Sequence, residues 1–332
     1  MTKKEIVILL STYNGEKFLS QQLDSLINQT YKEWLCLVRD DGSSDSTIDI
    51  LNTYASKYPE RFLIIDNMNQ NLRPCKSFMQ LLDSAPLATY FMFCDQDDVW
   101  EKRKIELTMK EMKKAEDRYG DGTPILVHSD LEVVDENLEL LAKSMKSLRK
   151  SNCEFNTINN LLLQNNVTGC TVMINSKLKE KVSRLPEKAI MHDWWLSLIA
   201  SCFGKIIYIE ETLIKYRQHS NNSVGAKAFG PANILEKVIK LNSANVMAKY
   251  ISYVNSIIEQ SREFLNIYEE QLKLEDREVL VAIKKLEREN YLQRMRILNK
   301  FNINAQNYIT GLLYKIILVF SSRVYDGDKK CS

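Results

Sequence analysis

The sequence predicts an α/β fold, with a mostly parallel sheet flanked by helices and a helical extension at the C-terminus. β-like runs alternate with helical stretches over residues 1 to about 217, and the 332-residue chain holds only 10 Gly and 6 Pro. Its character changes after Gly230-Pro231, beyond which no further Pro occurs. Alternating strands and helices are typical of parallel sheets covered on both faces, and sparse Gly and Pro argue against a β architecture with many turns.

The expected strands are short runs rich in aliphatic and aromatic residues, and the helical stretches between them repeat apolar residues every three or four positions. Strands are expected at 6–10, 35–38, 62–65, 90–93, 125–128, 170–174, 205–209 and 213–216. Helices are expected at 19–27, 46–56, 76–82, 102–114 and 194–203.

The chain after residue 227 is expected to form a separate helical region, which gives predicted domains of 1–227 and 228–332. Segments 238–265 and 269–298 carry apolar residues at mixed spacings of three and four, as two long packed helices do. We expect this region to serve oligomerisation, for example in a homodimer, or association with a membrane surface.

The membrane alternative rests on two patterns near the C-terminus. From Arg277 to Lys315 there are eight basic residues and three acids. The segment 309–320 is too short to span a bilayer, which needs about 20 residues. A basic helix followed by an apolar one can lie in the interface beside anionic lipid, whereas a helix docked on the core or in a dimer interface explains the pattern equally well. One helical stripe is predicted to hold Ile309, Leu312, Leu313, Ile316, Ile317 and Phe320.

Charge and cysteine content narrow the class of protein. The 45 basic and 43 acidic residues leave a net charge of +2, so no overall field attracts nucleic acid, and no nucleic-acid partner is expected. The seven cysteines are odd in number and lack Cys-x-x-Cys pairs, which indicates reduced thiols. The N-terminal segment passes directly into 6–10, a run too short for a signal peptide. The expected location is cytoplasmic. Peripheral contact with the inner face of the plasma membrane is a further expectation, which depends on the C-terminal helices.

The acidic turn after the run 90–93 is the most specific chemical feature of the sequence. It reads Cys-Asp-Gln-Asp-Asp-Val-Trp at 94–100, and open α/β sheets bind ligands where such strands end. Two Asp residues spaced i, i+2 can hold a divalent cation that prefers oxygen ligands and also bridges phosphates. A solvated acidic turn is the alternative.

Two earlier strand ends carry side chains of the same kind. Ser-Thr-Tyr-Asn-Gly follows the first expected strand at 11–15, and Arg-Asp-Asp-Gly-Ser-Ser-Asp follows the second at 39–45. Small polar residues and acids at this position lie where a nucleotide crosses a doubly wound sheet. An isolated Asp-Gly-Ser turn is common, but three such strand ends in sequence order indicate a nucleotide site.

Together these segments resemble the family 2 glycosyltransferases, which have the GT-A fold. The resemblance rests on STYNGEKFL at 11–19, DDGSSD at 40–45 and DQDDVW at 95–100, and it covers about residues 5–225. The last motif, at 95–100, is similar to that of bacterial rhamnosyltransferases that build cell-wall and capsular polysaccharide. The resemblance implies an inverting, metal-dependent transfer of L-rhamnose from dTDP-β-L-rhamnose to a lipid-linked saccharide. A UDP-glucose, UDP-galactose or UDP-N-acetylglucosamine donor is the alternative within the same fold.

The resemblance also implies roles for single residues, with Mg²⁺ or Mn²⁺ as the cofactor. The segment 69–74 departs from the Asn-x-Gly pattern common in the family, which leaves the contact of Arg73 with the nucleotide open. Arg217 suits a diphosphate, because its planar fork matches phosphate oxygens. Nucleotide contacts are expected from Thr12, Asn14, Asp40, Asp41, Arg73 and Asp95; metal ligation from Asp97, Asp95 and His219; and donor-sugar or diphosphate contacts from Asp98 and Arg217.

Inverting transfer needs one base to deprotonate the acceptor hydroxyl. Asp193 matches the base of the family, where the preceding residue is usually Glu and here is His192. Its position at the start of a helical run also fits a structural N-cap. Trp194 and Trp195 are predicted to stack on an acceptor sugar, although aromatic residues at a helix start also suit a core, and Gly169 lies in the segment that shapes the acceptor pocket.

Two other classes of protein fit parts of the pattern. A nucleotidyltransferase would carry a Gly-rich phosphate-binding loop after the first strand, but 11–19 contains a single Gly. A non-catalytic nucleotide-sugar binding or scaffold module would use the helical tail for assembly. The combination of a metal pair, a candidate base and the Arg217 and His219 pair in one chain favours the enzyme.

Overall fold

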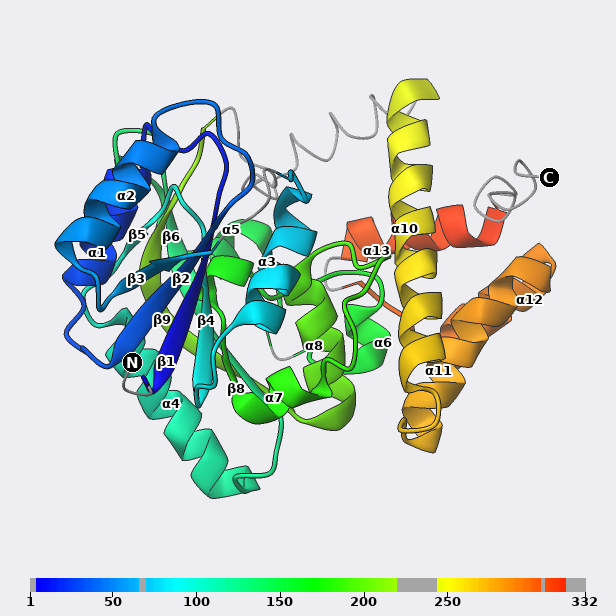
Figure 1. Cartoon of the computed structure of the whole chain (residues 1–332). Coiled ribbons are helices and arrows are strands. Elements are labelled where there is room, and N and C mark those ends of the chain that lie inside the picture. The colour runs from blue at the N-terminus through cyan, green and yellow to red at the C-terminus, as the bar shows by residue number, and fades with distance from the viewer. Residues whose placement is uncertain (1–3, 66–69, 154, 220–243, 306–307, 321–332) are drawn as a thin grey trace. The chain divides into compact units, whose positions relative to one another are not determined.

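The computed structural model describes residues 4–65, 70–153, 155–219, 244–305 and 308–320 (Figure 1). The chain divides into two compact units. Unit 1 comprises Met1–Ser147, Val167–Leu185 and Met191–Ala226, and unit 2 comprises Leu148–Asn166, Pro186–Ile190 and Lys227–Ser332. Unit 2 therefore takes in two segments that precede residue 228.

Unit 1 is built on a nine-stranded sheet in the order β3-β2-β1-β4-β8-β6-β9-β5, with β7 paired to β6. β1 runs parallel to both β2 and β4, and β2 runs parallel to β3. β8 is antiparallel to its neighbours β4 and β6, while β6 and β9 are parallel. The predicted α/β fold is confirmed. The strands are β1 (Ile6–Thr12), β2 (Trp34–Asp40), β3 (Phe62–Ile64), β4 (Tyr90–Cys94), β5 (Val99–Trp100), β6 (Ile125–Val134), β7 (Leu140–Ala142), β8 (Met173–Asn175) and β9 (Lys205–Arg217).

Helices flank this sheet, with α3 packed against β1 and α4 packed against β6 and β9 (Figure 1). The helix predicted at 19–27 is observed with those bounds, and the others differ by a few residues at their ends. The helices of this part of the chain are α1 (Leu19–Ile27), α2 (Thr47–Lys57), α3 (Arg73–Ser84), α4 (Lys104–Tyr119), α5 (Met145–Arg149), the 3-10 helix η1 (Gly169–Thr171), α7 (Ser176–Lys181) and α8 (His192–Phe203).

β1 shows why the sequence forms a central strand. Ile6, Ile8, Leu9 and Leu10 are all fully buried, as expected of the continuous apolar run of a parallel strand covered on both faces. Burying a side chain of this size contributes about 1.5–3 kcal/mol. The loop that follows Thr12 therefore starts from a rigid support.

Two strand predictions need correction. The strand predicted at 170–174 begins only at Met173, because Gly169–Thr171 form a 3-10 turn. The strands predicted at 205–209 and 213–216 are one continuous strand, β9. β9 stays paired with β6, and the irregularity is absorbed by register shifts near Asp130.

Unit 2 is helical in its described residues. The single helix predicted at 269–298 is divided in two because Asn290 starts a new helix: its side chain accepts the Gln293 N–H at 3.0 Å, and the Gln293 side chain accepts the Asn290 N–H at 3.4 Å. Such a capping box favours a helix start. Residues 238–243 of the other predicted helix lie outside the described residues. The helices are α6 (Ile158–Leu161), α10 (Ala244–Tyr268), α11 (Leu274–Lys285), η2 (Leu286–Arg288), α12 (Tyr291–Lys300) and α13 (Tyr308–Phe320).

None of the helices in the described ranges combines the length and the apolar character that crossing a membrane requires.

Candidate active site

The polar strand ends predicted from the sequence lie side by side at one edge of the sheet. Thr12 at the end of β1 is in register with Asp40 at the end of β2. On the other side of β1, Leu10 is in register with Cys94, directly before the acidic turn. Because these three strands are parallel, their carboxyl ends open onto the same edge, where α/β sheets bind ligands.

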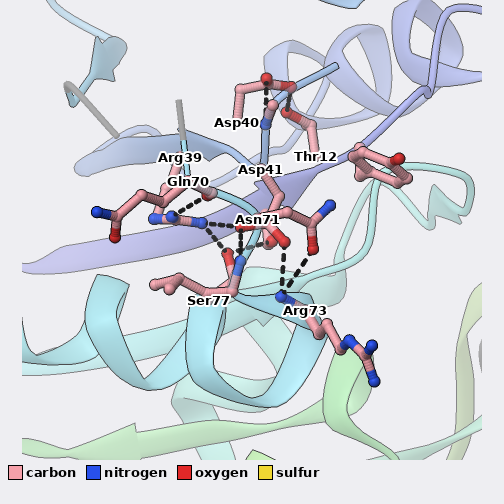
Figure 2. A network of polar contacts seen from close by, with 12 residues as sticks. Thr12, Arg39, Asp40, Asp41, Gln70, Asn71, Arg73 and Ser77 are labelled. Atoms are coloured by element: carbon pink, nitrogen blue, oxygen red, sulfur yellow. Dashed lines mark hydrogen bonds and ion pairs between the residues drawn. The ribbon is translucent and has the colours of Figure 1, made fainter. Parts of the chain in front are cut away.

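Asp40 organises the turn that follows β2 (Figure 2). Its Oδ1 accepts the Thr12 hydroxyl at 2.8 Å, and its Oδ2 accepts the backbone N–H groups of Gly42 and Ser43 at 3.0 and 2.8 Å. The side chain is buried. Asp40 thus ties the ends of β1 and β2 together.

Asp41 joins the same turn to the start of α3 (Figure 2). Its carboxylate forms a buried ion pair with Arg39 and accepts the backbone N–H groups of Leu72 and Arg73 at 2.9 and 2.8 Å. Arg39 also donates to the Ser77 hydroxyl at 3.0 Å and to the Gln70 carbonyl at 2.8 Å. A carboxylate at a helix N-terminus is stabilised by the unpaired N–H groups there. Asp41 is therefore held by protein donors, with its backbone at the carboxyl end of β2.

Arg73 adopts a backbone conformation unusual for a residue with a side chain. Its φ is +64°, in the left-handed region that favours glycine. Its N–H donates to Asp41 and also to the Asn71 side chain at 3.2 Å, while the exposed guanidinium extends away from this network (Figure 2). The structure thus places Arg73 beside Asp41 with its charge directed elsewhere.

The loops after β1, β2 and β4 are fastened to one another. The Asn14 backbone N–H donates to the Ser43 hydroxyl, and the Asn14 side-chain oxygen Oδ1 accepts the Ser44 N–H, both at 2.8 Å. Gln96 exchanges two hydrogen bonds with the Tyr13 backbone, at 2.8 and 3.0 Å. A Cβ at Gly15 would lie 2.4 Å from Gln96 Oε1, so this position accepts only glycine without rearrangement. The role of Gln96 has no signal in the sequence, since a Gln inside an acidic motif is not distinguished from any other polar residue.

The predicted metal ligands Asp97 and His219 lie together. Asp97 Oδ2 is 2.7 Å from His219 Nε2, and both side chains are largely buried. A carboxylate oxygen and an imidazole nitrogen fit a divalent cation such as Mn²⁺, and Mg²⁺ is accepted by the carboxylate. A second group of potential ligand atoms, from Asp95, Asp98 and Cys170, lies within 4.8 Å of one another. Its thiol is a soft ligand that suits Mg²⁺ and Mn²⁺ poorly, so the Asp97 and His219 pair fits better.

Asp95 lies where negative charge accumulates. Burial, followed by the negative charges of Asp97 and Asp193, raises the pKa of Asp95 to about 7. Asp193 Oδ2 lies beside Gly169, and the thiol of the next residue, Cys170, is within 4.8 Å of carboxylate oxygens of Asp95 and Asp98. Asp193 therefore approaches the acidic turn, although it is almost a hundred residues away in the sequence. The candidate base and the candidate metal ligands therefore belong to one site.

Asp98 and Arg217 connect the acidic turn to the end of β9. Asp98 is fully buried, and its Oδ1 accepts the Arg217 N–H at 3.1 Å. Arg217 is 1% exposed as a whole residue. Its guanidinium lies over the Phe18 ring and donates to the backbone oxygen of Asp97 at 2.8 Å, to the Glu136 backbone oxygen and to Gln21. The Arg217 guanidinium thus faces protein acceptors, and the contacts expected of Asp98 with the donor sugar and of Arg217 with the diphosphate remain predictions.

Asp193 occupies the first turn of α8, beside Gly169. Its Oδ1 accepts the Trp194 N–H at 2.6 Å. This carboxylate oxygen therefore satisfies a backbone N–H of the first helical turn, as the side chain of a helix cap does. A Cβ at Gly169 would lie 2.7 Å from His192 Nε2 and 3.4 Å from Asp193 Oδ2, so glycine permits this close approach. Gly169 therefore helps to shape the surroundings of the candidate base.

His192 and the two tryptophans are core residues. His192 lies against the rings of Phe78 and Phe93, at centroid distances of 4.3 and 4.9 Å, and burial lowers its pKa to about 3. Trp194 is 2% exposed and Trp195 is fully buried. The prediction that the indoles stack on an acceptor sugar does not agree with the structure, because neither presents a face to solvent.

Lys104 is a buried residue that the sequence analysis missed. It is fully buried at the start of α4, with Nζ 3.9 Å from the centroid of the Trp100 ring. Burial lowers its pKa to about 8, and the nearby Cys170, Cys94 and Asp98 oppose that shift. In the sequence it is one of three clustered basic residues before a helix, a pattern that normally indicates a solvated face.

The mostly parallel sheet and its flanking helices form a fold like that of the GT-A glycosyltransferases. Residues 7–125 match the family model described as glycosyl transferase family 2, which assigns this part of the chain to that family. The family prediction made from the sequence is confirmed.

Several characterised and uncharacterised proteins are similar to the chain. The dTDP-rhamnosyl transferase RfbG of Shigella flexneri is 27% identical over 227 residues, which cover 65% of this chain and 74% of the relative. The putative teichuronic acid biosynthesis glycosyltransferase TuaG of Bacillus subtilis is 23% identical over 274 residues, covering 78% and 98%. For an uncharacterized glycosyltransferase of Rickettsia prowazekii, RP339, the chain spans 64% of its length at 27% identity. The crystal structure of S. aureus TarS in complex with UDP-GlcNAc aligns with a TM-score of 0.53 at 16% identity, covering 98% and 91%, which supports the fold.

Proposed function

We propose that this glycosyltransferase is an inverting enzyme that uses a divalent cation and a nucleotide-activated sugar. The observation that carries this proposal is the convergence of Asp95, Asp97, His219 and Asp193 at the carboxyl ends of the parallel strands. Carboxylates gathered beside a nucleotide edge supply both a base and a cation site, which are the two requirements of a single displacement.

In the proposed mechanism, Asp193 accepts the proton of the acceptor hydroxyl while that oxygen attacks the anomeric carbon and the bond from the sugar to the diphosphate breaks. Asp97 and His219 are the residues that would hold Mg²⁺ or Mn²⁺. When bound, the cation neutralises the charge that develops on the leaving diphosphate. Asp98 and Arg217 keep the Asp97 backbone in place, as their hydrogen bonds to each other and to that backbone support.

On the nucleotide side, we propose that Thr12, Asn14, Asp41 and Arg73 shape the pocket for the base and ribose. Thr12 and Asp41 act through the turn that they fix, since their polar atoms bond to Asp40, Arg39 and the start of α3. Arg73 has an exposed side chain next to this turn. Its guanidinium supplies the cation that a phosphate or a base carbonyl would recognise.

For the donor we propose dTDP-β-L-rhamnose, with formation of an α-linked rhamnoside on a lipid-linked saccharide of a bacterial cell-wall or capsular polysaccharide. The proposed donor is supported by the sequence of the acidic turn and by the name of the RfbG relative. The proposed cell-wall polysaccharide is supported by the name of the TuaG relative. The alternative is a UDP-hexose donor on the same fold.

A donor screen tests the proposal. The protein is incubated with Mn²⁺ and, separately, dTDP-rhamnose, UDP-glucose, UDP-galactose or UDP-N-acetylglucosamine, and both the unfolding temperature and the release of nucleoside diphosphate are measured. We expect stabilisation and slow hydrolysis with dTDP-rhamnose only. A response confined to a UDP-sugar would replace rhamnose by that hexose, and no response to any donor, with or without cation, would contradict the proposed enzyme.

A further inference from the structure

The end of unit 2 carries an exposed apolar patch formed by α12 and α13. Its members come from both helices, and the rings of Tyr291 and Phe320 join them with centroids 6.2 Å apart and an interplanar angle of 21°. Large apolar side chains gathered in this way usually mark an interaction surface. The exposed fractions are 55% for Tyr291, 48% for Leu292, 46% for Met295, 48% for Leu312, 47% for Ile316 and 66% for Phe320.

The exposed row on α13 is separate from the face that the fold of unit 2 uses. Tyr314, Ile317 and Leu318 are buried, and Tyr314 packs against Tyr253 of α10 with ring centroids 5.5 Å apart. Leu312, Ile316 and Phe320 follow one another at intervals of four and therefore share the other face. The single stripe predicted from the sequence is thus divided, since Ile317 points inward while Leu312 and Ile316 point outward; the side chain of Ile309 lies outside the described residues.

The charges within α12 and α13 have one sign, and the acids Glu287 and Glu289 precede α12. Between Asn290 and Phe320 the sequence contains no Asp or Glu, and its basic residues are Arg294, Arg296, Lys300 and Lys315. Arg296 and Lys300 are exposed on α12, the helix that also presents Tyr291 and Met295. An apolar patch with basic neighbours is the composition of helices that lie in a membrane interface.

The same charges disfavour a second copy of this chain as the occupant. In a two-fold interface each patch meets its own equivalent, so α12 and α13 of the other copy would offer no acid to offset Arg296 and Lys300. An anionic lipid surface instead offers opposite charge, and each basic residue near such a surface adds about fivefold in affinity. α13 has 13 residues, too few to span a bilayer of about 20 residues.

We propose that the patch on α12 and α13 binds the surface of an anionic membrane, with the apolar side chains entering the headgroup boundary and Arg296 and Lys300 contacting lipid headgroups. The binding does not depend on the donor or on the transfer reaction. For an enzyme with a lipid-linked acceptor, it would confine the search for substrate to the membrane plane.

Flotation of the full chain with vesicles tests this proposal. One set of vesicles is phosphatidylcholine alone, and the other contains about 25% phosphatidylglycerol. We expect binding to the anionic vesicles that weakens at high salt, and at least about tenfold weaker binding to the neutral ones. Equal binding to both, or no binding to the anionic vesicles, would overturn the proposal.

Two variants locate the contact. The triple substitution Leu312→Ser, Ile316→Ser and Phe320→Ser should reduce binding at least about tenfold, because it removes three inserting side chains. The double substitution Arg296→Glu and Lys300→Glu should reduce it by a similar factor and abolish the salt effect. The latter changes only exposed side chains, so it remains informative if circular dichroism shows that the triple variant is unfolded.

A matched control comes from unit 1, where Leu140 and Leu141 on β7 are 49% and 61% exposed. Substituting both by Ser should leave vesicle binding unchanged. Binding that falls equally in this control would mean that exposed leucine in general, and not the patch, contacts lipid. A dimer in size-exclusion chromatography that the triple variant converts to a monomer would assign the patch to self-association and overturn the proposal.

Discussion

The ends of β2 and β4 both carry clustered aspartates, Asp40 and Asp41 after β2 and Asp95, Asp97 and Asp98 after β4, but the two clusters have different surroundings. Asp40 and Asp41 accept hydrogen bonds from backbone N–H groups, a hydroxyl and Arg39. The pKa of Asp95 is instead raised, mainly by burial and then by the negative charges of Asp97 and Asp193. The aspartates after β2 stabilise the fold of the loops at this edge of the sheet, whereas those after β4 concentrate negative charge of the kind that a bound cation offsets.

The largest effect is expected at the acidic end, from Asp193→Asn. The amide keeps the shape and the hydrogen bond to Trp194 but cannot accept a proton at neutral pH, so turnover should fall by about 10²–10⁴. Donor binding, measured by calorimetry, should stay within a few-fold of the unsubstituted protein. If turnover persists, Asp193 serves only as a helix-terminal residue, and its loss should appear as a change of about 1 kcal/mol in unfolding free energy.

At the β2 end, the corresponding substitution should act on stability. Asp41→Ala leaves the buried Arg39 without its ion-pair partner and α3 without a cap, and it should lower the free energy of unfolding by about 3–5 kcal/mol. Denaturant unfolding measures this loss. In the double variant Arg39→Met with Asp41→Ala, the loss should be clearly smaller than the sum of the losses measured for Arg39→Met and Asp41→Ala singly. Strict additivity would show that the two side chains do not act as a pair.

A smaller effect is expected from removing one proposed metal ligand. His219→Ala should weaken Mn²⁺ binding about 10–100-fold, judged by the loss that substitutions around metal sites typically cause. The cation dependence of donor binding, followed by calorimetry at increasing Mn²⁺, measures it. Asp117→Ala provides the control, since Asp117 is an exposed acid on α4. An unchanged Mn²⁺ dependence in His219→Ala would exclude this pair as the cation site.

The buried His192 should make the protein less stable in acid. Its pKa falls from 6.5 to about 3 on burial, so between these pH values the unfolded chain binds a proton that the folded chain does not. Stability should therefore be constant with respect to this group above pH 6.5 and decline below it, with a limiting slope of about 1.4 kcal/mol per pH unit. His192→Phe should flatten the decline seen in thermal unfolding, and an identical slope in both proteins would show that His192 is protonated in the folded state.

The comparison between the two strand ends also shows what the sequence could predict. The strands were predictable because parallel strands are apolar along their length, as in 6–10 and 90–93, and polar at their ends. The division of 269–298 was missed because Asn290 and Gln293, which start α12, are ordinary polar residues in a helical pattern.

Within the site, residue type and position along a motif indicated which residues come together, but not what each side chain faces. Asp97 and His219 are in contact as their motifs suggested. Arg217 and the two tryptophans are buried instead, because β9 and the first turn of α8 lie inside unit 1, where an arginine must find protein acceptors and an indole contributes to the core. Burial of this kind depends on tertiary packing and has no local signal.

The smallest expected effect separates the backbone of Arg73 from its side chain. The left-handed conformation at φ +64° costs a residue with a Cβ about 1–2 kcal/mol relative to glycine. Glycine at this position removes that cost from the folded state, but it also makes the unfolded chain more flexible, which reduces the stabilisation by about 0.4–1 kcal/mol. Arg73→Gly should therefore be more stable than Arg73→Ala, by up to about 1 kcal/mol in denaturant unfolding. Both variants lack the guanidinium, so if it contacts the nucleotide they should weaken donor binding equally. Weaker binding in Arg73→Ala alone would mean that the backbone of the loop, held by Asp41, determines nucleotide affinity and that the exposed charge does not.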